Sequence, residues 1–396
     1  MNKSVYQCLI PLWDLSFIFW FAVAFIYGNS LLVTLALALF MGLSVAVLLL
    51  KGKFKIPAIA VFYAFFIFIC LLNVRLGYSM RPTDSMAMVS TMLKGLLFMC
   101  VTCYYAAMRG TGKFLDIFVN STLLGSVAIY VLNLLATGSL IIREQGAFNA
   151  NTFAVASAFA VCYIIFKDGH RTLIGGAKIA WFLLFCLAAG TRKAIVAIIV
   201  ILAVYMILKS PKKLLLNMVY VGVFVAATYF LLTKIPFVYE SIGYRFVSLL
   251  KMLEGGSGDS SAESRQMYID LALKYFENRP MWGHGINCFK LLDGANETYS
   301  HNNFTELLFG VGIIGAVSYY LMHLWVLLAA IVNYLKHKSQ NALISIAFII
   351  GVVVTDIAWV AYYERTIVIF VILCYVLLNE ERNDGEKNTE TSKESI

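Results

Sequence analysis

The chain has 396 residues, of which 61% are apolar and only 13% are charged, and its mean hydropathy is +0.81. These values exclude an ordinary water-soluble domain and indicate a protein that crosses a membrane several times. The net charge of +9 does not imply binding to nucleic acid, because lysines in short loops between apolar segments supply much of it.

Apolar runs of about 20 residues predict twelve membrane-spanning helices. Their approximate bounds are 9–27, 30–50, 56–72, 86–108, 114–137, 151–166, 173–189, 193–208, 213–233, 304–335, 341–361 and 366–379. We expect no cleavable signal peptide before the first span. The fold class predicted is therefore all-α and polytopic.

The spans divide the chain into four parts. Residues 1–233 hold the first nine helices, residues 234–303 form one large extracytoplasmic loop, and residues 304–379 hold the last three helices. The polar segment 380–396 is expected to be a disordered cytoplasmic tail.

The charges between the spans predict the orientation of the chain. Lysine-rich loops follow every second span, and such loops remain in the cytoplasm under the positive-inside rule. The loops of the opposite side instead carry single arginines, namely Arg75, Arg81, Arg143, Arg192 and Arg365. A guanidinium group binds phosphate oxygens in pairs, so this bias favours a phosphate-containing ligand. The simpler alternative is that loops contain some arginine by chance.

The long loop between 234 and 303 has a helical pattern of its own. Apolar residues recur at helical spacing over 238–253 and again over 267–276, on either side of the Gly/Ser-rich stretch GGSGDSSAES. We expect two amphipathic helices that lie in the membrane interface and cover a cavity. The segment NRPMWGHGINCF at 278–289 then predicts a tight turn, because it contains a proline and two glycines.

The stretch SHNNFTELLFGVGIIG at 300–315 joins a polar cluster to the tenth span. Asn303 is a good N-cap, and Glu306 three places later completes a capping-box pattern, which predicts a helix from about Phe304. The three glycines of the stretch would let a second backbone approach closely within a bilayer. His301 is expected at the rim of the bundle, just before the N-terminus of this helix.

Four segments, taken together, resemble the O-antigen ligase and O-antigen polymerase superfamily, which are bacterial membrane glycosyltransferases of the GT-C type. The segments are QGAFNANTFA at 145–154, GTRKAIVAII at 190–199, the loop from Arg265 to RPMWGHGINCF, and SHNNFTELLFGVGIIG. They match a Gly-x-x-x-x-Asn helix entry, a Thr/Ser-Arg turn after a span, an arginine that opens a long helix, a Pro-x-x-Gly-x-Gly turn, and His-Asn before a Gly-rich span. The resemblance covers about residues 143–335, and the first four spans match in hydropathy alone.

The resemblance implies glycosyl transfer on the outer face of the bacterial cytoplasmic membrane. The donor would be a glycan on undecaprenyl diphosphate, and the acceptor a sugar hydroxyl on another lipid-linked glycan. Fixed cations can stabilise a departing diphosphate without a nucleotide, and we expect no metal or other cofactor. By position in the family motifs, Arg192 and Arg265 are the expected cations, with Arg143 as a weaker third.

His301 is the expected general base, because a neutral imidazole accepts a proton at neutral pH. The alternative is a histidine that only helps to cap its helix. Asn302, Tyr268 and Glu263 are further candidates for substrate binding, with the Tyr268 ring packing on a sugar and Glu263 as an alternative base. Asp356 falls within a predicted span, where an ionisable side chain is costly and either functional or paired with a polar neighbour.

We favour a repeat-unit polymerase for O-antigen, capsule or exopolysaccharide, because no feature points to a lipid A core acceptor. An O-antigen ligase, which acts in lipopolysaccharide assembly, remains the alternative. A transporter of the same lipid-linked glycan is a third hypothesis, but the sequence shows neither internal repeats nor broken helices in matching halves. The expected partners are the lipid-linked donor and acceptor, membrane lipids, a flippase and a chain-length regulator, with no nucleic acid.

Overall fold

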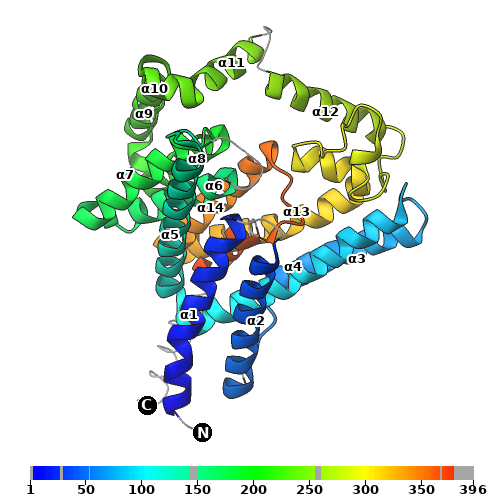
Figure 1. Ribbon diagram of the computed structural model, residues 1–396, viewed down its shortest axis with the longest axis horizontal. Coiled ribbons are helices and arrows are strands. Elements are labelled where there is room, and N and C mark those ends of the chain that lie inside the picture. Colours follow the sequence, from blue (N-terminus) through cyan, green and yellow to red (C-terminus); the bar gives the residue numbers. More distant parts are fainter. Residues whose placement is uncertain are drawn as a thin grey trace.

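The computed structural model describes residues 3–26, 30–52, 54–142, 150–254, 260–365 and 368–378, and every regular element within these ranges is helical (Figure 1). This confirms the predicted all-α class. The long helices are α1 (Lys3–Ile26), α2 (Leu31–Lys51), α3 (Ala58–Arg75), α4 (Pro82–Arg109), α5 (Thr111–Thr137), α6 (Ala150–Phe166), α7 (Leu173–Ala188), α8 (Arg192–Lys209), α9 (Leu214–Lys234), α13 (Asn303–His337) and α14 (Gln340–Thr355).

Shorter elements complete the described chain. The long loop between α9 and α13 contains α10 (Pro236–Val238), η3 (Tyr239–Gly243), α11 (Tyr244–Leu253), α12 (Ser260–Phe276) and η4 (Phe289–Leu291). Single helical turns elsewhere are η1 (Gly169–Arg171), η2 (Pro211–Lys213) and η5 (Asp356–Ala358), and an apolar helix follows at Val368–Leu378.

Eight of the described helices are long and apolar enough to cross a membrane, namely α1 to α5, α9, α13 and α14. Helices α6, α7 and Val368–Leu378 are apolar but shorter, and α8 carries basic residues at both ends. Each of the predicted spans coincides with one of these helices to within a few residues. The chain is therefore a multi-pass membrane protein.

Helix α6 forms the middle of the bundle, because nearly all of its side chains are buried between α5, α7 and α8. The close packing depends on small residues at the contacts. A Cβ added to Gly125 of α5 would stand 2.2 Å from the ring of Phe153, and one added to Gly351 of α14 would stand 2.5 Å from the side chain of Ile201 on α8. Tight packing of this kind holds the ends of α6, α8 and α14 in place.

Helices α11 and α12 lie at one end of the molecule, opposite the end where α1 begins (Figure 1). Helix α9 leads to α10 and α11, and α12 packs against α13. The two expected amphipathic helices are thus present, and both extend across the same end of the helical body.

Helix α13 is interrupted at Gly312, whose backbone (φ 64°, ψ −166°) is not helical. The expectation of a continuous span is therefore wrong for this helix. A broken helix leaves backbone groups without helical partners, and these groups must be satisfied within the protein. The N–H of Ile313 donates to the carbonyl of Pro280 at 2.8 Å, and the N–H groups of His284 and Gly285 donate to the carbonyls just before the break at 2.8 and 2.7 Å.

The second backbone that approaches the glycine-rich stretch is therefore the turn of the long loop, residues 279–288. A Cβ on Gly312 would stand 2.3 Å from the carbonyl oxygen of Met281, and one on Gly310 would stand 3.3 Å from the Cα of Ile286. The glycines admit the backbone of the turn because a side chain at either position would occupy the space that the turn takes.

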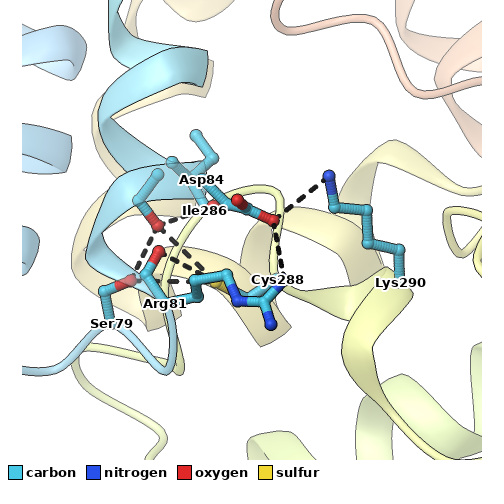
Figure 2. Close-up of polar contacts among 7 residues, drawn as sticks. Ser79, Arg81, Asp84, Ile286, Cys288 and Lys290 are labelled. Atoms are coloured by element: carbon cyan, nitrogen blue, oxygen red, sulfur yellow. Dashed lines mark hydrogen bonds and ion pairs between the residues drawn. The ribbon is translucent and has the colours of Figure 1, made fainter.

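The connection between α3 and α4 holds the same turn from the other side (Figure 2). The Ser85 hydroxyl donates to the carbonyl of Ile286 at 2.8 Å and lies 2.8 Å from the hydroxyl of Ser79. Lys290 forms an ion pair with Asp84 at 3.3 Å. The turn is thus fixed between α3, α4 and α13, and the chain leaves it in a defined direction toward His301.

Candidate active site

A cavity of about 660 Å³ lies beneath α11 and α12. Its walls come from the start of α8, the end of α14 with η5, the segment η3 to α12, and the residue just before Asn302. Arg192, Arg265 and His301, the three predicted catalytic residues, all line this one cavity although they come from distant parts of the sequence.

The start of α8 forms the floor of the cationic side of the cavity. The hydroxyl of Thr191 donates to the side-chain oxygen of Asn151 at 2.6 Å, which ties the start of α8 to the start of α6. Asn151 is the asparagine of the Gly-x-x-x-x-Asn pattern. The guanidinium of Arg192 donates to the carbonyl of Arg245 at 2.8 Å. The positive end of the α8 dipole and the Arg192 side chain therefore both contribute positive potential to the same part of the cavity.

Basic side chains outnumber acidic ones among the described residues that line the cavity. Arg192, Lys193, Arg245 and Arg265 line it, and Glu240 is the one acidic residue among the described lining residues. The Lys193 ammonium lies 3.9 Å from the centre of the Trp359 ring, a cation–π contact that holds it at the wall. A site of this composition suits a polyanion such as a diphosphate. Sequence reasoning missed Lys193, whose one signal was its position next to Arg192.

Apolar residues also line the cavity, so its lining offers contacts to both the anionic head and the apolar part of an amphiphile. Its apolar residues are Ile141, Ile142, Val196, Ile269, Val354 and Ile357.

His301 has a left-handed backbone (φ 58°), and its ring lies between those of Tyr299, at a centroid distance of 4.3 Å, and Tyr268, at 5.9 Å. Burial and, to a smaller extent, the positive charges of Arg265 and Lys193 together lower the pKa of His301 to about 4. The imidazole is therefore neutral at physiological pH and can accept a proton.

The N-cap of α13 is Asn302, and the prediction of Asn303 as the cap is wrong. The side-chain oxygen of Asn302 accepts from the backbone N–H groups two and three residues later, at 2.9 and 3.2 Å. Glu306 accepts from the backbone N–H of Ser300 at 2.8 Å and not from the cap residue. Asn302, a predicted substrate-binding residue, therefore uses its side-chain oxygen to end the turn that carries His301.

Asn303 cannot cap the helix because its amide points into the protein. Its nitrogen donates to the hydroxyl of Tyr320 at 3.0 Å and to a carboxylate oxygen of Asp356 at 3.1 Å. Its oxygen accepts from the backbone N–H groups of Ala361 and Tyr362, at 2.8 and 3.3 Å. Asp356 is thus paired with polar neighbours, which is one of the two explanations given above for an ionisable side chain in a predicted span. The network joins the start of α13 to the chain after α14.

Two of the remaining predicted residues, Glu263 and Tyr268, are not among the lining residues of the cavity. Glu263 is exposed on α12. The lining residues Ser261, Arg265 and Ile269 recur every four positions along this helix, and Glu263 falls on another face. Tyr268 is buried, and its hydroxyl accepts from the amide of Asn296 at 3.1 Å. Arg143 lies outside the described residues.

Comparison with known proteins supports the resemblance stated above. Residues 177–320 match the family model described as O-antigen ligase. The matched region starts within α7 and ends within α13, so it contains Arg192, Arg265 and His301. No curated protein matches the chain.

Proposed function

We propose that the chain polymerises undecaprenyl-diphosphate-linked repeat units into a surface polysaccharide, and the match of residues 177–320 to the O-antigen ligase family model supports this proposal. The product would be an O-antigen, a capsule or an exopolysaccharide. The observation that carries the proposal is the single cavity in which Arg192, Arg265 and His301 meet. The reaction takes place on the outer face of the cytoplasmic membrane, the side on which the positive-inside rule places the long loop.

The diphosphate of the donor binds among the basic side chains, and its polyprenyl chain contacts the apolar residues of the lining. Arg192 and Arg265 then stabilise the negative charge that grows on the leaving diphosphate. Lys193 and Arg245 line the same space and add to the positive potential.

In the transfer step, the acceptor hydroxyl oxygen forms a bond to the anomeric carbon of the donor sugar. Its proton passes to a ring nitrogen of His301, and the bond between the anomeric carbon and the diphosphate breaks with its electron pair on the phosphate oxygen. The proton on His301 is later lost to solvent. The step is balanced without a metal or any other cofactor.

The environment of His301 matches this order of events. Burial, together with the charges of Arg265 and Lys193, makes the imidazole a weak base. A bound diphosphate brings negative charge to the same cations, and an adjacent negative charge raises the pKa of an imidazole. His301 therefore becomes a stronger base when the donor is in place.

Transfer of the finished glycan to lipid A core, the ligase reaction, is the second candidate, because the matching family model is described as O-antigen ligase. It uses the same type of donor and the same leaving group. The two candidates differ in the acceptor alone.

The test of enzyme activity uses purified protein in liposomes with lipid-linked repeat units supplied on the outer side and no ion gradient. Longer lipid-linked glycans in the product, and their absence with His301→Ala protein of equal amount, are expected. Folded protein that leaves substrates of verified quality unchanged would rule out a polymerase and favour the transporter or ligase hypothesis.

A further inference from the structure

Asn303, two residues after His301, is held by hydrogen bonds to every polar group of its side chain. The amide nitrogen donates to the hydroxyl of Tyr320 at 3.0 Å and to Oδ2 of Asp356 at 3.1 Å. The amide oxygen accepts from two backbone N–H groups that follow η5 in the sequence. The side chain thus uses both donors and both acceptor positions of its amide, which allows one orientation only.

The hydroxyl of Tyr320 belongs to the same network. It donates to Oδ2 of Asp356 at 3.0 Å, and the ring stacks on Phe304 at a centroid distance of 4.7 Å. Asn303, Tyr320 and Asp356 therefore form a triangle of hydrogen bonds around one carboxylate oxygen. Asp356 is the member of this triangle that lies outside α13.

The residues on either side of Asp356 in the sequence line the cavity. Thr355, Ile357 and Ala358 are lining residues, whereas Asp356 is fully buried and is not among them. The carboxylate thus contacts the start of α13 while its neighbours contact the cavity. It joins two parts of the lining that are far apart in the sequence, η5 and the segment that contains His301.

The hydrogen bonds of Ser300, on the other side of His301, are local by comparison. Its backbone N–H donates to Glu306 at 2.8 Å, and its hydroxyl donates to the carbonyl of Asn302 at 2.9 Å. These bonds shape the turn within residues 300–306. The bond from Asn303 to Asp356, in contrast, connects residues that are 53 positions apart.

The proposed reaction requires a defined distance between the imidazole of His301 and the sugar of the bound donor. A displacement of about 1 Å between reacting groups can lower a rate by about 100-fold. His301 also has a positive φ, and such a backbone persists only where neighbouring residues enforce it. The link from η5 to the start of α13 supplies a constraint of this kind.

We propose that Asp356 is a positioning residue for the transfer reaction, whose carboxylate accepts the hydrogen bonds of Asn303 and Tyr320 and thereby holds His301 at a fixed place relative to η5. This inference rests on the proposed function. Asp356 is buried behind the lining residues, so its role requires an acceptor oxygen and no exchange of a proton with the substrates.

The first test separates the acceptor oxygen from the charge, with kcat for glycan elongation in liposomes as the measurement. Asp356→Leu removes both, and kcat should fall by about 100-fold. Asp356→Asn keeps an acceptor oxygen and loses the charge. Its kcat should stay within about fivefold of wild type, because a neutral acceptor forms a weaker hydrogen bond than a carboxylate.

The matched control is Ser345→Ala, which removes a buried hydrogen bond from α14 to the carbonyl of Cys374. It should keep the wild-type kcat, so it separates loss of stability from loss of position. An Asn variant as slow as the Leu variant, or a Leu variant with the wild-type rate, would overturn the inference.

A second measurement follows the imidazole itself and needs no transfer activity. Burial, ahead of the charges of Arg265 and Lys193, lowers the pKa of His301 to about 4. A loosened segment should let this pKa rise toward the ordinary value of about 6.5. NMR of 15N-histidine-labelled protein, with His301→Ala to assign the signal, should show that His301 titrates between about pH 5 and 7 in Asp356→Leu but not in wild type or Asp356→Asn.

A His301 signal that is the same in Asp356→Leu and wild type would overturn the inference. If His301 titrates in Asp356→Leu while wild-type protein shows no transfer activity, the link between Asp356 and His301 stands and the proposed polymerase function fails.

Tyr320→Phe tests the same network if Asp356→Leu does not fold. It removes one hydroxyl and keeps the ring that stacks on Phe304, so it should lower kcat about tenfold and raise the pKa of His301 to a smaller extent. A wild-type kcat together with a wild-type His301 signal in this variant would contradict the positioning role.

Discussion

The backbone of His301 has a left-handed conformation that residues other than glycine rarely adopt, and its ring is held between two tyrosines. Such a conformation persists only where the surroundings enforce it. Here the cap of α13 by Asn302 and the buried amide of Asn303 fix the residues that follow. The structure thus holds the imidazole in one orientation at the edge of the cavity.

The first prediction concerns His301→Ala. If the imidazole accepts the acceptor proton, its removal should lower the rate of transfer by about 10²- to 10⁴-fold without loss of membrane insertion or abundance. The measurement is the rate of glycan elongation in liposomes. His170→Ala, an exposed histidine in η1, is the control and should keep the wild-type rate. A His301→Ala rate close to that of the control would remove His301 from the mechanism.

The second prediction follows from the charge of Arg265. The positive charge of Arg265 is one of the causes that lower the pKa of His301 to about 4. Arg265→Gln removes this charge and should therefore raise that pKa. Activity needs the neutral imidazole and is lost as pH falls through its pKa, so the acid limb of the kcat/KM profile should move to higher pH. The absolute rate should also fall by about 10²- to 10³-fold, because a donor to the leaving diphosphate is lost.

The control for this profile is Arg171→Gln, since Arg171 is exposed in η1 and far from the lining of the cavity. An acid limb of Arg265→Gln that coincides with the limb of this control would show that Arg265 does not act on His301.

At the scale of elements, the break in α13 and the turn 279–288 form one unit. The hydrogen bonds that the helix lacks around Gly312 are made with the turn, and the turn is held in addition by α3 and α4 (Figure 2). The segment from the turn to Asn302 is therefore held at one end by the turn and at the other by the start of α13. This arrangement explains how a long loop can carry a residue that needs a defined position.

The third prediction is that Gly312→Ala disrupts this unit. The position has a positive φ, and the new Cβ would overlap the carbonyl oxygen of Met281, so we expect a loss of about 1–3 kcal/mol of stability and reduced transfer activity. Thermal unfolding of the detergent-purified protein measures the loss. Gly42→Ala in α2 is the control, because a Cβ there meets no atom within 4 Å. Equal unfolding temperatures for the two variants would contradict the role of the break.

At the scale of the whole molecule, the cavity exists because segments far apart in the chain converge at one end of the bundle. The segment after α5, the starts of α6 and α8, the elements η3, α11 and α12, His301, and the end of α14 with η5 each contribute lining residues. Helix α9 has little buried surface and connects the bundle to α11. Helices α11 and α12 bring Arg265 into the cavity that Arg192 lines, which a bundle of spans alone would not do.

The fourth prediction distinguishes the two candidate reactions in cells. A strain without this gene should carry single repeat units on the final acceptor if the protein is a polymerase, because transfer of one unit does not need elongation. Gel electrophoresis of extracted glycolipids reads the chain length. Long glycans that accumulate on the carrier lipid, with none on the final acceptor, would instead identify a ligase.

The sequence alone determined the membrane class and predicted Arg192, Arg265 and His301 as site residues, which the structure brings to one cavity. Hydropathy and charge are local properties, so a window of about 20 residues contains the information that defines a span. The superfamily resemblance rests on short motifs in order, and the O-antigen ligase family match over 177–320 agrees with it.

The tertiary structure decided which of two adjacent asparagines caps α13, what the glycines at 310–315 contact, and which lysine and tyrosine accompany the predicted residues. The spacing to Glu306 favours Asn303 as the cap in the sequence, but the distant Asp356 and Tyr320 bind its amide inside the protein and leave Asn302 as the cap. Such choices depend on contacts between residues far apart in the chain. The physical reason is that side-chain burial and hydrogen bonding are settled by packing between elements, which no local pattern contains.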